Sequence, residues 1–405
     1  MKEYRLICTN CHESYEKETK NFRCDSCNEP LELEEVKEGK INQGNVLRQT
    51  SLERYREFFP YLNIDNLSQA NLNEGFTALN SSAKLAEDYG VMNIYFKNET
   101  QNPTWSFKDR GTVTGVLRAI DLGIKKIGTV STGNMATSVA AYGAKSGLDT
   151  YILVKKGIAD EKIKPIAIYG PELIEVEGDY SKLYDESLAI GHENDIYFLN
   201  SDVPYRVEGY KTMAFEICEQ LDFNMPDYVI VPTSAGGDIR GIEKGFREFL
   251  NVGLIDKIPK MIVSQASGCS PIYNAFKDNK LEIDRVENPD TIAHAIENPY
   301  PPSGNQVLRM LKRNGGLAVG VSDDEIINAQ KKLASIGLFV QPGSATSLAA
   351  IERLVNDNIL KESDSIVCVL TGSGLKYTAA LDKHDLEVHN CKLEDLNDFI
   401  KKVGK

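Results

Sequence analysis

The feature that most constrains the fold of this chain is an alternation, after about residue 70, of short apolar segments with segments of helical periodicity. The apolar segments have the length and composition of strands and comprise residues 94–96, 127–130, 151–154, 173–176, 228–231, 261–263 and 366–370. Because parallel strands need long crossover connections, usually helices, the alternation predicts an α/β fold with mostly parallel sheet covered by helices on both faces. Ligands of such sheets bind beyond the carboxyl ends of the strands, so functional residues are expected in loops that follow strands.

The first polar loop of this kind, residues 98–111, runs from a strand into a helix and has Lys108 at its centre. A lysine at a helix start lies near free backbone N–H groups and the positive end of the helix dipole, which favours its neutral form. A neutral amine can form a Schiff base with an aldehyde cofactor. The loop therefore indicates Lys108 as a catalytic residue and pyridoxal phosphate as the cofactor. An ordinary solvated lysine at a helix start is the alternative.

Within this loop, residues 102–110 read Asn-Pro-Thr-Trp-Ser-Phe-Lys-Asp-Arg and resemble the lysine motif of the threonine synthase family, whose members are fold-type II pyridoxal phosphate enzymes. The resemblance implies a tryptophan synthase β-like fold with two open, mostly parallel α/β domains. The catalytic core then spans residues 36–405, and a smaller subdomain of about residues 125–205 is inserted in the larger one. Trp105 stands where the family usually has glycine, and its indole must reshape one wall of the site, narrow substrate access, or pack under the cofactor loop.

The second loop, residues 131–136, follows the segment that ends at Val130 and precedes another helix. Its glycine, its hydroxyls and the N–H groups of the helix start form a cradle for a carboxylate, although a plain helix N-cap is the alternative. By resemblance this is the substrate loop of the family, in which Asn134 also faces the ring hydroxyl of the cofactor. The implied substrate-binding residues are Ser131, Thr132, Asn134 and Met135. Met135 departs from the family, which commonly has threonine there.

The third loop, residues 233–238, has paired glycines that let consecutive N–H groups converge on a phosphate. A structural strand-to-helix turn is the alternative. The loop resembles the phosphate cup of the family, which implies cofactor binding by Thr233, Ser234, Ala235, Gly236 and Gly237. Asp238 stands where asparagine is more usual, and a carboxylate beside a phosphate must point away or be neutralised.

The fourth loop, residues 371–376, follows the most apolar strand segment of the chain. By resemblance Thr371 is the hydroxyl partner of the pyridine nitrogen of the cofactor. A hydroxyl there tunes the ring as an electron sink without enforcing full protonation of the nitrogen. The alternative is a loop after a buried strand.

Residues 200–212 resemble the Asn-Ser … Arg-x-Glu-Gly-x-Lys-Thr segment of threonine synthases. In that family the asparagine, serine and arginine hold the phosphate of O-phosphohomoserine, so the resemblance implies these roles for Asn200, Ser201 and Arg206. A planar guanidinium with neighbouring amide and hydroxyl donors suits a dianionic phosphate. A surface ion pair is the alternative for the arginine.

Near the N-terminus, two Cys-x-x-Cys pairs are separated by twelve residues: Cys8, Cys11, Cys24 and Cys27. Four thiolates at this spacing can bind Zn²⁺ tetrahedrally, and so small a segment has too little apolar area to fold without such a staple. We therefore expect a structural zinc ribbon over residues 1–35, with reduced or redox-paired thiols as the alternative.

The composition limits the partners. A net charge of −13 disfavours nucleic acid, and no apolar run is long enough to span a membrane. Without a secretory segment at its start, the chain is expected in the cytoplasm, with a small amino-acid phosphate as substrate. A homodimer is expected from the family resemblance alone.

The resemblance implies a lyase that converts O-phosphohomoserine and water to threonine and phosphate, in threonine biosynthesis. A pyridoxal phosphate enzyme that catalyses β-elimination or β-replacement on serine, threonine or a phosphorylated hydroxy-amino acid is the first alternative. A zinc-ribbon interaction scaffold whose core has lost its cofactor is the second.

Overall fold

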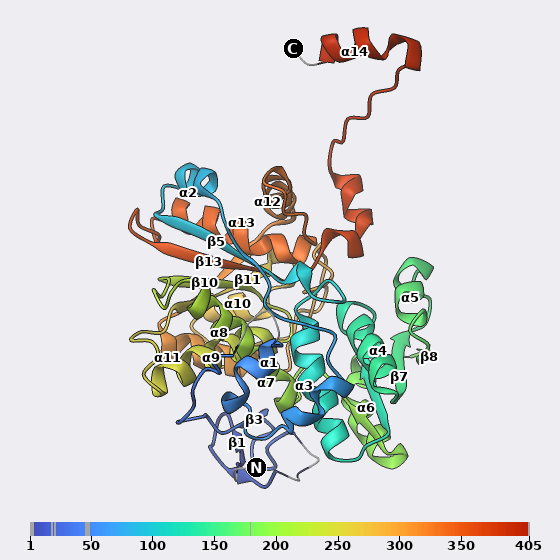
Figure 1. Ribbon diagram of the computed structural model, residues 1–405, viewed down its shortest axis with the longest axis vertical. Coiled ribbons are helices and arrows are strands. Elements are labelled where there is room, and N and C mark those ends of the chain that lie inside the picture. The colour runs from blue at the N-terminus through green and yellow to red at the C-terminus, as the bar shows by residue number, and fades with distance from the viewer. Residues whose placement is uncertain (1–3, 18, 20–21, 45–48, 179, 404–405) are drawn as a thin grey trace.

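The computed structural model describes residues 4–17, 19, 22–44, 49–178 and 180–403. Parts of the predicted zinc ribbon, residues 1–3, 18 and 20–21, therefore lie outside the described residues. Within the described ranges the strands form three sheets, of six, four and three strands (Figure 1). The chain is thus an α/β protein with two mostly parallel sheets, as the sequence predicts, and a small N-terminal sheet precedes them in the chain.

The larger sheet has the strand order β12-β11-β10-β13-β5-β4. Its strands are β4 (Leu79–Ser81), β5 (Asn93–Asn98), β10 (Tyr228–Pro232), β11 (Lys260–Ala266), β12 (Leu317–Val321) and β13 (Ser365–Leu370). All neighbouring pairs are parallel except β4 with β5. At the centre of the sheet, Val367 of β13 pairs with Val229 on one side and with Tyr95 on the other.

Both faces of this sheet are buried, which explains the continuous apolar runs of its strands. Val229 and Val231 of β10 pack in one hydrophobic cluster, and Ile230 between them packs in another on the opposite face. The first face is covered by α8 (Lys211–Gln220), α9 (Gly237–Asn251), α10 (Pro271–Lys277) and α11 (Gly304–Asn314). The second is covered by α2 (Ala83–Tyr89), α12 (Asp323–Ser335) and α13 (Pro342–Asn356). Figure 1 shows the two groups of helices above and below the strands.

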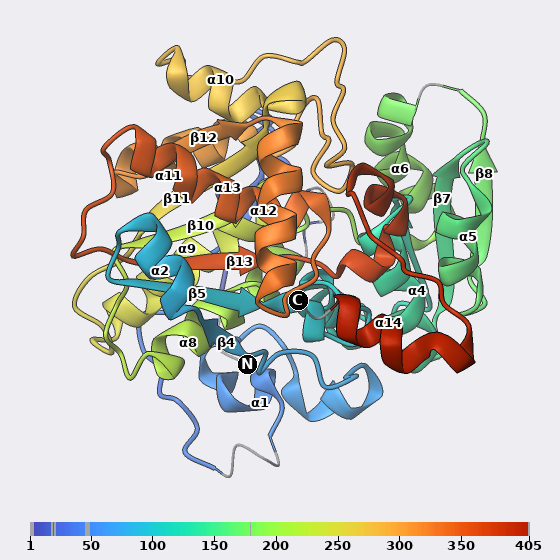
Figure 2. The same ribbon diagram turned by 90° about the horizontal axis from the view of Figure 1, so that it is seen from above.

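The smaller sheet is entirely parallel, with the strand order β8-β7-β6-β9. Its strands are β6 (Lys126–Val130), β7 (Asp149–Lys155), β8 (Glu172–Val176) and β9 (Ile196–Phe198), and its helices are α4 (Asn134–Ser146), α5 (Asp160–Ala167) and α6 (Tyr180–Asn194). Figure 2 shows these elements grouped beside the larger sheet. They fall within residues 125–205, and the domain boundaries stay a prediction.

The chain enters the smaller sheet through α3 (Lys108–Asp121) and leaves it through α7 (Pro204–Gly209). The two helices cross where both have glycine. A Cβ added to Gly111 would lie 2.7 Å from the carbonyl oxygen of Arg206, and one added to Gly209 would collide with that of Arg110. Glycine is therefore required at both positions for the helices to pack this closely.

A buried ionic cluster lies between the larger sheet and α3. Arg110 Nε donates to Glu99 Oε2 at 2.6 Å, and its Nη1 donates to Glu216 Oε1 at 2.7 Å. Lys97 Nζ donates to the second oxygen of Glu216, also at 2.7 Å. All four side chains are at most 2% exposed. The cluster pins the start of α3 to β5 and α8.

The N-terminal region folds as a small antiparallel sheet and a connector. The sheet has the order β2-β1-β3, with β1 (Leu6–Cys8), β2 (Ser14–Tyr15) and β3 (Leu31–Leu33). The connector contains α1 (Ser51–Arg54), η2 (Arg56–Phe58) and η3 (Ile64–Gln69). Phe58 is fully buried against Phe215 and Phe249, so the connector packs onto the core.

Short 3₁₀ helices and one terminal helix complete the structure: η4 (Glu99–Gln101), η5 (Ser267–Cys269), η6 (Gly374–Lys376), η7 (Thr378–Lys383), η8 (Leu393–Asp395) and α14 (Leu396–Val403). The last of these projects away from the body of the molecule (Figure 1). No helix in the described part of the chain is both long enough and apolar enough to cross a membrane.

Candidate active site

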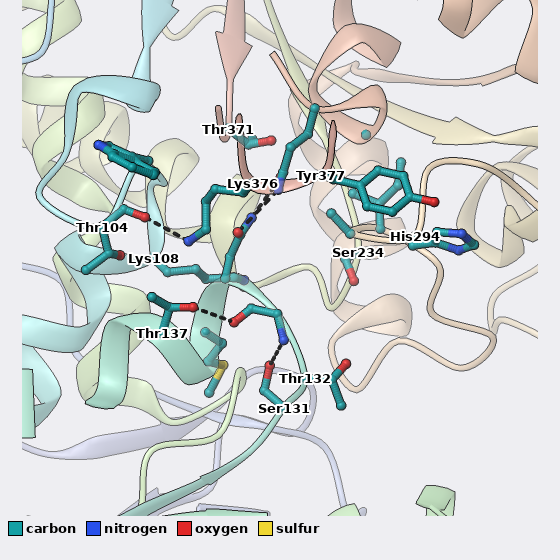
Figure 3. Close-up of a pocket in the computed structure, with 18 of the residues that line it drawn as sticks. Thr104, Lys108, Ser131, Thr132, Thr137, Ser234, His294, Thr371, Lys376 and Tyr377 are labelled. Carbon is teal, nitrogen blue, oxygen red and sulfur yellow. Dashed lines mark hydrogen bonds between the residues drawn. The ribbon is translucent and has the colours of Figure 1, made fainter. Parts of the chain in front are cut away.

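A cavity of about 850 Å³ lies where the loops after β5, β6, β10 and β13 meet (Figure 3). Most of the residues predicted for the site line it: Lys108, Ser131, Thr132, Asn134, Met135, Ser201, Ser234, Ala235, Gly236, Gly237 and Thr371. The predicted residues Thr233, Asn200 and Arg206 do not line it and lie behind its walls. The roles of all these residues stay predictions.

Lys108 is the first residue of α3, and its position is fixed by the loop before it. The Phe107 N–H donates to the carbonyl oxygen of Thr371 at 3.0 Å, which joins this loop to the end of β13. The buried Asp109 carboxylate accepts from the Thr104 hydroxyl and the Ser138 hydroxyl, each at 2.6 Å. These bonds hold the lysine at the meeting point of the two sheets.

The environment of Lys108 lowers its pKa to about 7. Burial is the main cause, the positive charge of Arg206 adds to it, and Asp238 acts against both. The direction agrees with the expectation from the helix start, but the structure assigns it to burial and a neighbouring cation. A substantial fraction of this amine is therefore neutral at neutral pH and able to attack a carbonyl.

The start of α4 brings the second predicted loop to the cavity. No side chain caps its first turn within the described part of the chain, and the Ser131 hydroxyl instead accepts from the Gly133 N–H at 3.3 Å. Asn134 Nδ2 donates to Gln341 Oε1 at 2.9 Å, so this loop contacts the start of α13. The free N–H groups of the first turn remain available to an anion.

The start of α9 has the features of a phosphate site. Gly236 has φ +91°, and a Cβ on Gly237 would lie 2.8 Å from the carbonyl oxygen of Ser201. No described side chain caps this helix of fifteen residues, and Ser234, which precedes it, points into the cavity (Figure 3). The glycines thus expose backbone donors that side chains would cover.

Asp238 lies in the first turn of α9, where an ionised carboxylate would repel a bound phosphate. Its side chain is 7% exposed, and neither carboxylate oxygen has a hydrogen-bond partner among the described residues. Burial raises its pKa to about 8, against the opposing effect of Lys108. The group is therefore mostly a neutral acid at pH 7, and it need not repel a bound phosphate.

Thr371 directly follows β13 and lines the cavity. Its hydroxyl is 2.8 Å from the hydroxyl of Ser344, which in turn accepts from the Gly372 N–H at 2.9 Å. This pairing fixes the position of the Thr371 hydroxyl between the end of β13 and the start of α13.

Several lining residues were not predicted from the sequence, among them His294, Gln341, Lys376 and Tyr377. Lys376 Nζ donates to the carbonyl oxygen of Thr104 at 2.8 Å, and burial lowers its pKa to about 8 (Figure 3). The sequence did contain a signal for Lys376, because it belongs to the loop of residues 371–376, which directly follows a buried strand. Tyr377 is the next residue after that loop and shares the signal, whereas His294 and Gln341 come from segments without it.

The residues behind the walls have protein partners. Asn200 donates to the Ser187 hydroxyl at 2.9 Å, and the Thr233 hydroxyl donates to the carbonyl oxygen of Val231 at 2.8 Å. Arg206 is fully buried, and its Nη1 lies 3.1 Å from the sulfur of Met135. The alternative of a surface ion pair for this arginine is therefore wrong.

Trp105 lies at the rim of the cavity. Its side chain is 52% exposed, and its backbone has φ +64°, the left-handed region that favours glycine. The structure thus agrees with an indole that narrows access and excludes one packed under the cofactor loop.

The four N-terminal cysteines lie close together in the small sheet. Their sulfur atoms are all within 4.8 Å of one another, a spacing suited to one metal ion. None of them lines the cavity, so the cluster is separate from the candidate active site.

The cavity fits pyridoxal phosphate. It offers an amine with a lowered pKa, an uncapped glycine-rich helix start for the phosphate, and a fixed hydroxyl opposite. The buried Asp238 oxygens, unpartnered among the described residues, also face a site in which a polar group is expected.

Fold and cavity together define a pyridoxal phosphate-dependent enzyme of fold type II: the family model described as "Pyridoxal-phosphate dependent enzyme" matches residues 70–372. Among curated proteins, the threonine synthase of Methanocaldococcus jannaschii is 40% identical over 91% of this chain and 92% of its own length. That of Methanosarcina acetivorans is 36% identical over 92% of each chain. The chain belongs to the threonine synthase family.

A solved structure agrees on the fold. The processed form of threonine deaminase isoform 2 from Solanum lycopersicum superposes with a TM-score of 0.65 at 20% identity, over 87% of this chain and 98% of that one. At this identity the likeness concerns the fold alone, and it places the chain among α/β proteins of this architecture.

Proposed function

We propose that the protein is a threonine synthase, which converts O-phosphohomoserine and water to L-threonine and phosphate with pyridoxal phosphate. The observation that supports this most strongly is the match to curated threonine synthases over nearly the whole chain. When bound, the cofactor withdraws electrons from the substrate and stabilises negative charge at its carbon atoms.

The chain's own residues divide the remaining work. Lys108 would hold the cofactor through its aldehyde group, and its amine would move protons at Cα and Cβ of the substrate. Its pKa of about 7 suits an amine that must both accept and donate a proton. Residues proposed to bind the cofactor are Asn134, Thr233, Ser234, Ala235, Gly236, Gly237 and Thr371. Residues proposed to bind the substrate are Ser131, Thr132, Asn134, Met135, Asn200, Ser201 and Arg206.

The test is a panel of amino-acid substrates assayed for both phosphate and keto-acid release. O-phosphohomoserine is expected to yield phosphate and threonine in equal amounts. Keto acid released from threonine or serine, without turnover of O-phosphohomoserine, would contradict the proposal.

A second candidate is β-elimination or β-replacement on serine, threonine or a phosphorylated hydroxy-amino acid. Trp105 and Met135, which both line the cavity, favour it, because each is bulkier than the residue that the family resemblance implies at its position. O-phosphoserine in the same panel separates the two activities. A purified protein that binds no pyridoxal phosphate would instead favour the interaction scaffold.

For the N-terminal cysteines we propose one structural Zn²⁺ bound by Cys8, Cys11, Cys24 and Cys27. Four thiolates close the coordination sphere and leave no position for catalysis. Metal analysis should give one zinc per chain, and a strong chelator should lower the melting temperature while cofactor absorption persists below that temperature. Full metal removal without any change in melting temperature would contradict a structural role.

We further propose a cytoplasmic homodimer that binds neither nucleic acid nor membranes. The acidic composition and the family resemblance support this proposal. Light scattering of the purified protein tests the oligomeric state, with a mass of about twice 45.0 kDa expected.

A further inference from the structure

Arg206 is a buried cation without a counter-ion. Its side chain is fully buried, yet no carboxylate among the described residues forms an ion pair with it, and its Nε has no hydrogen-bond partner there. Its other contacts are long: Nη2 to the Tyr210 hydroxyl at 3.2 Å and to the Thr112 hydroxyl at 3.5 Å, and Nη1 to the carbonyl oxygens of Leu199 and Asn200 at 3.4 Å. A buried charge with so little compensation is costly, and an anion would relieve that cost.

The side chain of Met135 separates this cation from the cavity. Met135 lines the cavity and Arg206 does not. The shortest contact of the guanidinium is that of its Nη1 with the Met135 sulfur, at 3.1 Å, and the Ser201 hydroxyl lies 3.5 Å from the same sulfur. A thioether therefore occupies the place where two donors converge.

A thioether is a poor partner for these donors. Sulfur of this kind is a weak acceptor, whereas a phosphate oxygen bonded to a guanidinium makes one of the stronger hydrogen bonds in proteins. Methionine has three rotatable side-chain bonds and no branch, so it can change rotamer at low cost. An entering phosphate can thus replace the sulfur without moving the backbone of α4.

We propose that Met135 is a gate over the anion subsite at Arg206. In the free enzyme its side chain covers the guanidinium, and it swings aside only when a phosphomonoester group of the substrate takes the place of the sulfur. This inference rests on the proposed function and adds the residue that controls access to the phosphate subsite. Substrates without a distal phosphate leave the gate closed and meet an apolar wall.

The gate has a cost in affinity. The apparent affinity for an anion is reduced by the fraction of molecules whose gate is open. Threonine, which is common at this position in the family, is too short to cover the guanidinium. Met135→Thr should therefore open the subsite permanently, and Met135→Leu, of similar volume, should keep it covered.

The experiment measures binding of inorganic phosphate to the holoenzyme by calorimetry, for the wild type, Met135→Thr and Met135→Leu. Met135→Thr is expected to bind phosphate about 3- to 10-fold more tightly, and Met135→Leu no more tightly than the wild type. The gain should disappear when Arg206→Gln is added to Met135→Thr, with thermal melting as a check that the double variant is folded. Equal phosphate affinity of Met135→Thr and the wild type, or a gain that survives Arg206→Gln, would overturn the gate.

Kinetics with O-phosphohomoserine give a second readout. Met135→Thr should lower KM by a similar factor with kcat less affected, because the change concerns binding. Should no variant turn over O-phosphohomoserine, the proposed function fails, while the inorganic phosphate measurement still decides whether Met135 covers Arg206.

Discussion

The two sides of the cavity are built differently. The side formed by the larger sheet, with the loops after β10 and β13, is backed by strands buried on both faces and by the cluster around Glu216. The side formed by the smaller sheet is well packed on one face only, where Ile127, Ile152 and Val154 belong to the first large cluster. Its other face has a small cluster of its own, and much of β8 is exposed; the buried members of that cluster are Val130, Leu153, Leu183 and Phe198. Thinly packed elements open at lower free energy than well-packed ones. Most of the proposed cofactor residues thus lie on the side of the larger sheet, which is the more stable one. The loop of residues 131–136, proposed to bind the substrate carboxylate, lies on the side of the smaller sheet, which opens more easily.

The largest effect is expected from Lys108→Ala. Without the amine, turnover should fall by about 10³-fold or more, and the visible absorption of the bound cofactor should change. The matched variant is Lys376→Ala, which removes the other cavity lysine of lowered pKa and should leave the cofactor covalently attached. Reduction with borohydride followed by peptide mass spectrometry checks both variants. A label on Lys376 rather than Lys108 would refute the assignment.

The next effect tests the stability of the two sides directly. Glu216→Ala leaves buried Lys97 without its ion-pair partner and Arg110 with Glu99 alone, and should cost about 3–5 kcal/mol of unfolding free energy. Glu177→Ala removes the exposed pair with Lys156 beside the smaller sheet, which should change that free energy by less than about 1 kcal/mol. Urea unfolding of both variants makes the comparison. Similar losses for the two would mean that the larger sheet is not the better-anchored side.

A smaller effect concerns pH. Because only the neutral amine reacts, the rate at which the apoenzyme captures the cofactor should fall about tenfold per pH unit below 7 and level off above it. Arg206→Gln removes the cation that helps to lower the pKa of Lys108. In this variant the midpoint of the pH dependence of the capture rate should therefore move to higher pH. Stopped-flow absorbance across pH 5–9 checks this. An unchanged midpoint would show that burial alone sets the pKa.

The smallest effect is expected at Trp105. Since its φ is +64°, Trp105→Gly should be more stable than Trp105→Ala by about 1 kcal/mol, because alanine keeps the unfavourable backbone conformation. Both variants should widen the rim and lower KM for bulky amino acids to a similar extent. Thermal melting and KM measurements separate the backbone effect from the loss of the indole.

The long apolar strands were predictable because burial on both faces leaves no polar positions, as in β10 and β13. In the two larger sheets, three strands were not predicted. β4 and β9 have only three residues each, too few to show a period, and β12 contains Gly320. The antiparallel edge position of β4 also lies outside the alternation that revealed the others.

In the site, the loops were predictable because each follows a strand, but the placement of side chains within them was not. The sequence marks Met135 as unusual without revealing that it covers Arg206, a residue 71 positions further along the chain. Likewise, Lys108 has its lowered pKa mainly from burial, which no local pattern encodes. Contacts between distant segments decide these points.

The glycine crossing of α3 and α7 has an evolutionary consequence. Gly111 and Gly209 hold Lys108 and Arg206 on two helices whose backbones touch, so one added methyl group would disturb folding and chemistry together. We therefore expect substitutions that change substrate preference at the rim of the cavity and on α4 rather than at this helix crossing. Trp105 at the rim and Met135 on α4 are two such positions.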